Sequence, residues 1–371
     1  LREVAADVLD AERLALAQAG GRAGRYRVRL VALDASTPDA GRSDPAQISQ
    51  NARRAVQGMR TVAYLGELAT GTSAISIPLL NEAGILQVSP LDTAMAYTTR
   101  SLAVAGSPER YYPKLKEAGR TFARVVPSDR TQVDALLTAM RRAGVKRLAI
   151  LTDEDPSGRA LATNLRAKAR AAGIAVVARE EIDPHAARHD DAVARIRELR
   201  ADTVLDATGT RPAAARLWRE LHAADPLLQL YAPASLADPG FVAALGAAAA
   251  VAHVTRPVYE PLHGGPAAQR FVRDFRRAYR RVPAAEARYG YEAMRAVLAA
   301  IRRAEAAADG PITRRAVTRA FFETAVRGGV LGPYAIEPSG DTTLGRWGAF
   351  RAVDGRLRFA GGVGAGSAAE G

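Results

Sequence analysis

The sequence has no cysteine in its 371 residues, so disulfide bonds, thiolate metal sites and cysteine nucleophiles are excluded. It also has no long hydrophobic run. The longest weakly polar stretch, residues 243–254, is mostly alanine and is far shorter than the roughly 20 residues that span a bilayer. Nothing in the sequence therefore predicts a membrane-spanning segment.

Lysine is almost absent, with four residues, although the formal net charge is +13. The positive charge comes from arginine, which is spread along the chain and interspersed with acidic residues. A nucleic-acid interface usually gathers its basic residues in one stripe, with aromatic side chains between them. The even spread therefore predicts no nucleic-acid partner.

Strand and helix signals alternate through most of the sequence. The expected strands, rich in Val, Ile and Leu, are residues 26–33, 61–66, 85–90, 121–127, 147–153, 174–180, 203–208 and 228–233. The expected helices are residues 44–56, 73–83, 129–143, 158–172, 190–199 and 212–223. Strands separated by single helices predict parallel sheets covered on both faces. Two such runs, joined near residues 121–127, predict an α/β fold with two doubly wound lobes.

The pattern changes after residue 265. Three helices are expected at residues 266–280, 288–308 and 313–325, followed by strands in VLGPYAI and GRWGAFRAV. The closing segment GGVGAGSAAEG is of low complexity, which predicts a flexible tail from residue 361.

A cluster of small residues, Thr70, Gly71, Thr72 and Ser73, stands between an expected strand and an expected helix. A phosphate-binding P-loop would need a lysine here, and a nucleophile elbow would need a glycine two residues after the serine. Two readings stay open. The hydroxyls cap the helix, or they join its free amide N–H groups in holding a carboxylate. We favour the carboxylate, with the cap as the alternative.

Several segments resemble one known family. They are YLGELATGTS, NEAGILQVSPLDT, GRTFARVVPSDRTQ, RLAILTDEDPSGRALA, ADTVLDATGTRPAAARLW, RYGYEAM and LGPYAIEPSGD. In this order they resemble type I periplasmic binding proteins of the leucine/isoleucine/valine family, which are extracytoplasmic solute receptors of ABC transporters. The resemblance implies a monomer that binds a small carboxylate or amino acid in a cleft closed by hinge motion. It also implies a partnership with the transporter's permease subunits, no cofactor and no catalysis.

The resemblance also implies a division into lobes. The first lobe would comprise residues 1–123 and 256–331, and the second residues 124–255 and 332–360, with a tail at 361–371. Three crossovers would lie near Arg124, Thr255 and Gly332. The family begins with a strand that is central in the first sheet, whereas this sequence begins within a helix. We therefore expect upstream residues, including that strand and a removed export signal.

For the first lobe, the resemblance implies a carboxylate site after two neighbouring strands. The expected ligand contacts are Leu68, Thr70, Gly71, Thr72, Leu91, Asp92 and Thr93. In this reading the Thr93 hydroxyl and N–H bind the carboxylate, and the Leu91 carbonyl faces an amine.

For the second lobe, the expected contacts are Ser157, Gly209, Thr210 and Ala234. Here the sequence departs from the family, because Ser157 replaces an aromatic residue and Ala234 replaces the acid that neutralises the ligand ammonium. An unneutralised ammonium in a closed cleft is unfavourable. Either Asp92 or Asp206 supplies the counter-charge, or the ligand carries no ammonium. We lean toward a carboxylate ligand other than a leucine-like amino acid.

Alternative functions rest on weaker signals. His185 and His189, followed by two aspartates, have a spacing that metal sites use, but a solvated loop is the simpler reading. A hydrolase using Ser73 or Thr70 with His222 or His253 lacks a recognised base–acid spacing. The sensor domain of a receptor or regulator can share the fold, and it remains the main alternative.

Overall fold

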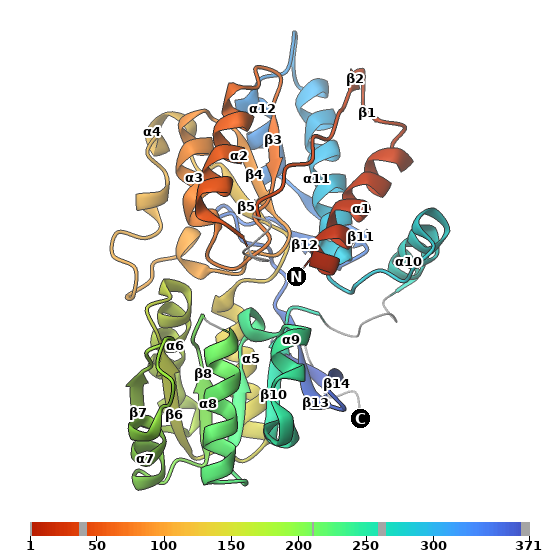
Figure 1. The fold of residues 1–371 in the computed structure, drawn as a ribbon. Coiled ribbons are helices and arrows are strands. Elements are labelled where there is room, and N and C mark those ends of the chain that lie inside the picture. The colour runs from red at the N-terminus through yellow and green to blue at the C-terminus, as the bar shows by residue number, and fades with distance from the viewer. Residues whose placement is uncertain (1, 37–42, 210, 259–264, 365–371) are drawn as a thin grey trace. The chain divides into compact units, whose positions relative to one another are not determined.

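The computed structural model describes the chain except for residues 1, 37–42, 210, 259–264 and 365–371 (Figure 1). Its contacts divide the chain into two compact units. Unit 1 comprises Leu1–Thr99, Gly106–Ser128 and Pro261–Leu344, and unit 2 comprises Arg100–Ala105, Asp129–Glu260 and Gly345–Gly371. None of the helices described is both long enough and apolar enough to cross a membrane.

Unit 1 contains seven α-helices among the described residues and two short hairpins beside its main sheet. The helices are α1 (Arg2–Gln18), α2 (Pro45–Gln57), α3 (Ser73–Glu82), α4 (Leu115–Ala118), α10 (Pro266–Tyr279), α11 (Ala287–Ala306) and α12 (Arg314–Phe322). The strands are β1 (Arg22–Ala23), β2 (Tyr26–Arg27), β3 (Ala63–Leu65), β4 (Leu86–Ser89), β5 (Phe122–Arg124), β11 (Ala325–Gly329) and β12 (Gly332–Ala335). Short 3-10 helices are η1 (Met95–Tyr97) and η2 (Glu109–Tyr111).

The sheet of unit 1 is parallel, in the order β3-β4-β5. Helices α2 and α3 pack together in one apolar cluster, and α11 and α12 bury their apolar faces against β4 and β5 in another. Helix α1 lies along α11, and the two helices approach closely at Gly290, where an added Cβ would stand 2.6 Å from the Val8 carbonyl oxygen. Both faces of this sheet are therefore covered by helices.

Unit 2 is built around one larger sheet. Its strands are β6 (Arg147–Thr152), β7 (Ala175–Glu181), β8 (Thr203–Asp206), β9 (Gln229–Ala232), β10 (Ala252–Arg256), β13 (Arg346–Val353) and β14 (Arg356–Gly364). Its helices are α5 (Asp129–Arg142), α6 (Pro156–Ala169), η3 (Arg170–Ala172), α7 (Asp190–Glu198), α8 (Arg211–Ala224), η4 (Ala234–Leu236), α9 (Pro239–Ala243) and η5 (Gly246–Val251).

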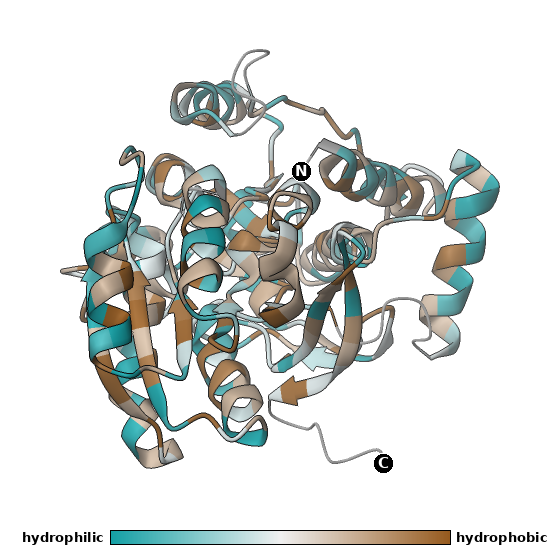
Figure 2. Cartoon of the chain, turned by 60° about the horizontal axis from the view of Figure 1, so that its bottom comes forward, coloured by the Kyte–Doolittle hydropathy of each residue, from teal (hydrophilic) through white to brown (hydrophobic). Residues whose placement is uncertain are grey.

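The strand order in unit 2 is β14-β13-β10-β9-β8-β6-β7. Strands β7, β6, β8, β9 and β10 run parallel, and β13 and β14 add to the edge in antiparallel fashion. Trp218 and Phe241 centre the core beneath α8, while Trp347 packs with α5 at Ala135. In Figure 1, α8 lies in front of the strands and α5 behind them. Figure 2 shows the strands of the chain mostly brown and the outward helix faces teal, as two-sided burial requires.

Two expected segments differ from the prediction. The expected strand at residues 26–33 is limited to β2, because residues 28–33 pair with no strand of the described chain, although Val28 and Leu30 pack against the core of unit 1. The flexible tail expected from residue 361 is wrong for its first four residues, since Gly361–Gly364 belong to β14 and pair with β13, and residues 365–371 lie outside the described residues. Glycine suits this strand end, because an added Cβ on Gly364 would stand 2.7 Å from the Gly345 carbonyl oxygen.

Candidate functional site

Two threonine side chains meet at the carboxyl ends of neighbouring strands in unit 1. Thr70 follows β3 and Thr93 follows β4, and these strands pair in parallel. The two hydroxyl oxygens lie 2.9 Å apart and share a hydrogen bond. Thr93 is 2% exposed and Thr70 is half-buried. The two threonines expected at the carboxylate site therefore lie side by side.

The amides at the start of α3 are not free, contrary to our expectation. The Asp92 carboxylate accepts hydrogen bonds from the N–H groups of Gly71 and Ser73, at 3.0 and 2.9 Å. The hydroxyl of Tyr97 accepts one from Ala74 N–H at 3.2 Å. Asp92 comes from the loop after β4, so this loop caps α3 in place of Thr72, whose own side chain makes no cap bond. Gly71 has φ of +92°, a conformation that favours glycine and brings its N–H toward Asp92.

Two backbone donors remain beside the threonine hydroxyls. Within the described part of the chain, the N–H groups of Thr70 and Thr93 have no hydrogen-bond partner. A buried N–H without a partner is rare in native proteins and is unfavourable by about 1–3 kcal/mol. The Thr72 hydroxyl is turned away, donating to the Ala69 carbonyl at 2.6 Å. Leu68 and Leu91 are half-buried next to this pair in sequence. Because one threonine hydroxyl donates to the other, one hydroxyl and two amides remain as donors, and they are suited to an anionic oxygen.

A buried carboxyl group, Glu67, lies at the base of the same loop. Tyr64 donates its hydroxyl to Glu67 at 2.8 Å, and the Glu67 N–H donates to the Ser73 hydroxyl at 3.3 Å. Burial raises the pKa of Glu67 to about 7, an effect that hydrogen bonds from Tyr64 and Ser76 oppose. The carboxyl group of Glu67, three residues before Thr70, therefore titrates near neutral pH.

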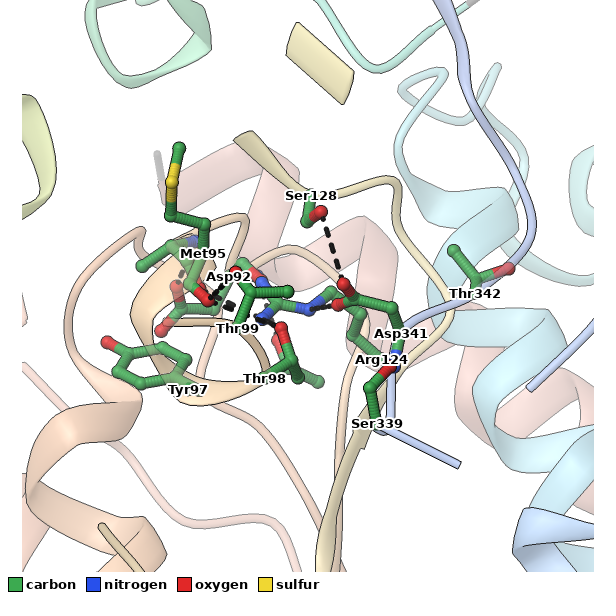
Figure 3. A network of polar contacts seen from close by, with 12 residues as sticks. Asp92, Met95, Tyr97, Thr98, Thr99, Arg124, Ser128, Ser339, Asp341 and Thr342 are labelled. Atoms are coloured by element: carbon green, nitrogen blue, oxygen red, sulfur yellow. Dashed lines mark hydrogen bonds and ion pairs between the residues drawn. The ribbon is translucent and has the colours of Figure 1, made fainter. Parts of the chain in front are cut away.

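A buried ion pair holds the second loop in place (Figure 3). Arg124, at the end of β5, is 0% exposed, and its Nε lies 2.9 Å from Asp341 Oδ1. The rest of the guanidinium donates to the carbonyl oxygens of Asp92 and Ala94, at 2.8 and 2.9 Å, and to the Thr98 hydroxyl at 3.1 Å. These carbonyls flank Thr93 on both sides. Arg124 therefore fixes the loop that presents the Thr93 hydroxyl.

The residues expected from the second lobe lie at one edge of the unit 2 sheet. Ser157 is in the first turn of α6, after β6, and is half-buried; Gly209 follows β8, and Ala234 begins η4 after β9. Strands β6, β8 and β9 are neighbours and parallel, so their carboxyl ends share this edge. Gly209 N–H donates to Asp153 at 2.8 Å, and an added Cβ on Gly209 would meet the Asp155 side chain at 2.9 Å. Thr210 lies outside the described residues.

Neither proposed counter-charge is placed to meet a ligand ammonium, which corrects that part of the prediction. Asp92 and Asp206 are both 0% exposed. Asp206 accepts hydrogen bonds from the N–H and hydroxyl of Thr208, at 3.0 and 2.7 Å, and from the Trp218 indole at 2.7 Å. Burial raises the pKa of both carboxyl groups. Asp92 accepts hydrogen bonds from the start of α3, and Asp206 accepts hydrogen bonds within unit 2, so each carboxyl group stabilises its own unit.

Two of the histidines considered for other chemistry are engaged elsewhere, whereas His222 Nδ1 is buried without a hydrogen-bond partner among the described residues. His189 Nδ1 lies 3.0 Å from Glu220, and His253 Nε2 lies 2.9 Å from Gln229 while its ring stacks on Tyr231. No group of three or more potential metal ligands is found among the residues that the structure describes.

Sequence reasoning missed Glu67, Arg124 and Asp341. Glu67 lies in the segment YLGELATGTS. It could have been found as a charged residue inside an otherwise uncharged strand-to-helix turn. Arg124 interrupts the otherwise apolar strand FARVV in the same way. No local pattern marks Asp341, because its partner lies 217 positions earlier in the chain and only the fold brings them together.

The chain is similar to solved structures of solute-binding proteins. A leucine-binding protein from Thermotoga maritima is 22% identical over 96% of this chain and 93% of its own, with a TM-score of 0.76. A solute-binding protein of an ABC transporter from R. palustris, in complex with benzoate, is 19% identical, covering 98% of this chain and 92% of its own, with a TM-score of 0.72. A putative branched-chain amino acid ABC transporter protein from Rhodospirillum rubrum is 24% identical over 96% and 95%, with a TM-score of 0.66. At these identities the likeness shows the fold.

Among curated proteins, none matches this sequence. The family comparison is more informative, because the match extends from residue 2 to residue 356, which is nearly the whole chain. Together with the two α/β units and their parallel sheets, this match establishes that the chain belongs to the periplasmic binding protein family.

Proposed function

We propose that this protein is the extracytoplasmic solute-binding component of an ABC transporter and that its ligand is a small carboxylate without an ammonium group. The observation that carries the proposal is the Thr70–Thr93 pair, whose hydroxyls and unpartnered amides converge at two neighbouring strand ends. The three donors left free by the bond between the hydroxyls can bind the oxygens of one carboxylate, and hydrogen bonds to a charged acceptor are stronger than neutral ones.

The ammonium-free ligand follows from the carboxylates. Ala234 has no charge, and Asp92 and Asp206 are engaged by α3 and by Thr208 with Trp218. A buried ammonium without a counter-charge is unfavourable. Related solved structures support an aromatic acid as the ligand class, since three of them hold benzoate or 4-hydroxybenzoate, although others hold leucine or isoleucine. In unit 2, we propose that Ser157, Gly209, Thr210 and Ala234 contact the body of the ligand.

The remaining parts of the proposal follow from family membership. The protein delivers its ligand to the permease subunits as a monomer, without covalent chemistry and without a cofactor. The alternative, a ligand-sensing domain of a receptor, uses the same ligand site. Reconstitution with the transporter's membrane subunits separates the two, because only a transport component stimulates uptake of the ligand.

Isothermal titration calorimetry with benzoate, 4-hydroxybenzoate, leucine and 4-methylpentanoate tests the ligand site. The last compound is the leucine skeleton without its ammonium, so tighter binding of 4-methylpentanoate than of leucine supports the proposal. In the Thr70→Ala/Thr93→Ala variant, carboxylate affinity should fall tenfold or more, because each hydrogen bond to a charged group contributes about 1.5–3 kcal/mol.

The matched control is Thr61→Ala/Thr318→Ala, which removes two hydroxyls of unit 1 away from the pair. Thr318 donates to the Arg314 carbonyl within α12. The control should bind like the wild-type protein. Equal affinity in the Thr70→Ala/Thr93→Ala variant and in the wild type would remove the threonine pair from the ligand site.

A further inference from the structure

One helix of unit 1 carries a dense row of arginines on its outer side. Within the twelve residues 270–281, six are arginine and one is aspartate, whereas lysine and arginine together make up 52 of the 371 residues of the chain. Five of the six form what we call the basic face of α10, and all five are exposed: Arg270, Arg273, Arg276, Arg277 and Arg280. Arginine is therefore concentrated in this segment, which corrects the expectation of an even spread along the chain.

The opposite side of α10 is apolar and buried. Ala268, Phe271 and Phe275 are at most 3% exposed and pack in one cluster with Ala11 and Leu14 of α1. At 100° per residue, the arginines occupy one arc of the helix and these buried residues occupy the other. Packing therefore fixes the helix with its basic face toward solvent, so that no apolar face of α10 is left to enter a membrane.

The arginines of the basic face are not neutralised within the protein. Among the described residues, none of the five makes an ion pair with an acidic side chain. Asp274, the acidic residue of the segment, accepts a hydrogen bond from Gln18 at 2.9 Å. Arg281, which follows the helix, is different, because it pairs with Asp7 and Asp10 of α1 at 2.6 and 2.8 Å.

This arrangement destabilises the helix locally. Arg273 stands three or four positions from Arg270, Arg276 and Arg277, and like charges at this spacing repel on a helix surface. An ordinary solvated face intersperses acids with bases, as the rest of this chain does. Part of this repulsion is offset, because Arg276 and Arg277 lie in the last turn at the negative end of the helix and Asp274 stands four positions from Arg270. The remaining local conflict between like charges is typical of a functional surface.

We propose that the basic face of α10 docks the protein on an anionic phospholipid surface. Guanidinium groups bind phosphate oxygens in paired hydrogen bonds, and a row from Arg270 to Arg280 extends roughly 15 Å, long enough for several headgroup contacts. An acidic protein partner fits less well, because the face lacks the aromatic or large apolar anchors that protein interfaces use. This choice rests on the proposed function, which places the protein outside the cytoplasm beside a membrane transporter, where phospholipid headgroups are at hand.

Vesicle co-sedimentation at low and physiological salt tests the proposal, using phosphatidylglycerol/phosphatidylcholine vesicles and vesicles of phosphatidylcholine alone. The test variant is Arg273→Gln/Arg276→Gln/Arg277→Gln/Arg280→Gln. The control removes four exposed arginines dispersed over unit 2, Arg141→Gln/Arg166→Gln/Arg170→Gln/Arg197→Gln, and so has the same net charge. Circular dichroism verifies that both variants are folded.

We expect the wild type to bind phosphatidylglycerol vesicles in a salt-dependent manner, with at least a tenfold loss in the test variant and less than a threefold loss in the control. Equal losses in the two variants would show that net charge alone attracts the protein and would overturn the proposal, as would an absence of vesicle binding. Binding of poly-glutamate but not of vesicles, lost in the test variant only, would assign the face to an acidic protein instead. Ligand affinity should be the same in all three proteins, so the result is independent of the ligand site.

Discussion

Breaking the buried Arg124–Asp341 pair should be strongly destabilising, and by different amounts depending on which partner is removed. Asp341→Ala leaves a guanidinium that is 0% exposed without its counter-charge, which costs about 3–5 kcal/mol. Arg124→Met leaves the Asp341 charge alone and also removes the donors to the carbonyls of Asp92 and Ala94. Each of these orphaned acceptors costs about 1–3 kcal/mol more.

The double variant contains neither uncompensated charge. It retains only the orphaned carbonyls, so its destabilisation should be about 2–6 kcal/mol. This is less than the sum of the two single variants, because the double variant lacks both uncompensated charges, which cost about 3–5 kcal/mol each. Additivity of the two substitutions to within about 0.5 kcal/mol would refute this account, because it would mean that the charges do not interact.

The two units can be followed separately in a urea titration. Both tryptophans, Trp218 and Trp347, belong to unit 2, so their fluorescence reports on unit 2, whereas circular dichroism reports on both units. The substitutions lie in unit 1 and should shift the dichroism transition most. Among molecules that remain folded, Arg124→Met should also bind the carboxylate ligand more weakly, since the loop that presents Thr93 loses its anchor.

Two further outcomes concern unit 1. The pKa of Glu67 is raised to about 7 from an ordinary value of 4.5, so between these pH values the folded state binds more protons than the unfolded state. The free energy of unfolding should therefore fall by up to about 3 kcal/mol as pH rises from 4.5 through 7. Melting temperatures of Glu67→Gln measured over this pH range should lack this decrease, and an unchanged decrease would contradict the assignment. Gly290→Ala should destabilise the protein by about 1–3 kcal/mol, because the new Cβ meets the Val8 carbonyl oxygen at 2.6 Å and forces α1 away from α11. A melting temperature equal to that of the wild type would show that the two helices are not closely packed at this position.

Much of the fold could be predicted from the sequence because local signals agree with it. The helix expected at residues 44–56 is α2, whose start is marked in the sequence by Asp44 followed by Pro45, and the Asp44 carboxylate accepts the Gln47 N–H at 2.9 Å. The alternation of strands and helices predicted parallel sheets, which are present in both units. The prediction of a strand over residues 26–33 was wrong beyond Arg27. Alternation of apolar and polar residues indicates that a segment is half-buried, but a strand also needs a neighbouring strand to pair with.

The candidate site was predictable only in part. The Thr70–Thr93 proximity followed from the rule that parallel strands end at one edge. The hydrogen bonds from the α3 amides to Asp92 could not be predicted, because this carboxylate comes from another loop and its direction depends on tertiary packing. The same holds for Arg124 and Asp341. The lobe boundaries near Arg124, Thr255 and Gly332, and the ligand roles of the named residues, remain proposals.

The capping of α3 by Asp92 has a consequence for how the empty protein behaves. A helix terminus that relied on a dissociable anion would be left with its positive end uncompensated at every release event. Here the balancing carboxyl group is tethered to the same polypeptide, so in the proposed function it stays in place when the ligand leaves. The order of the strand-end loops then does not depend on the proposed ligand, which has only the threonine donors to bond.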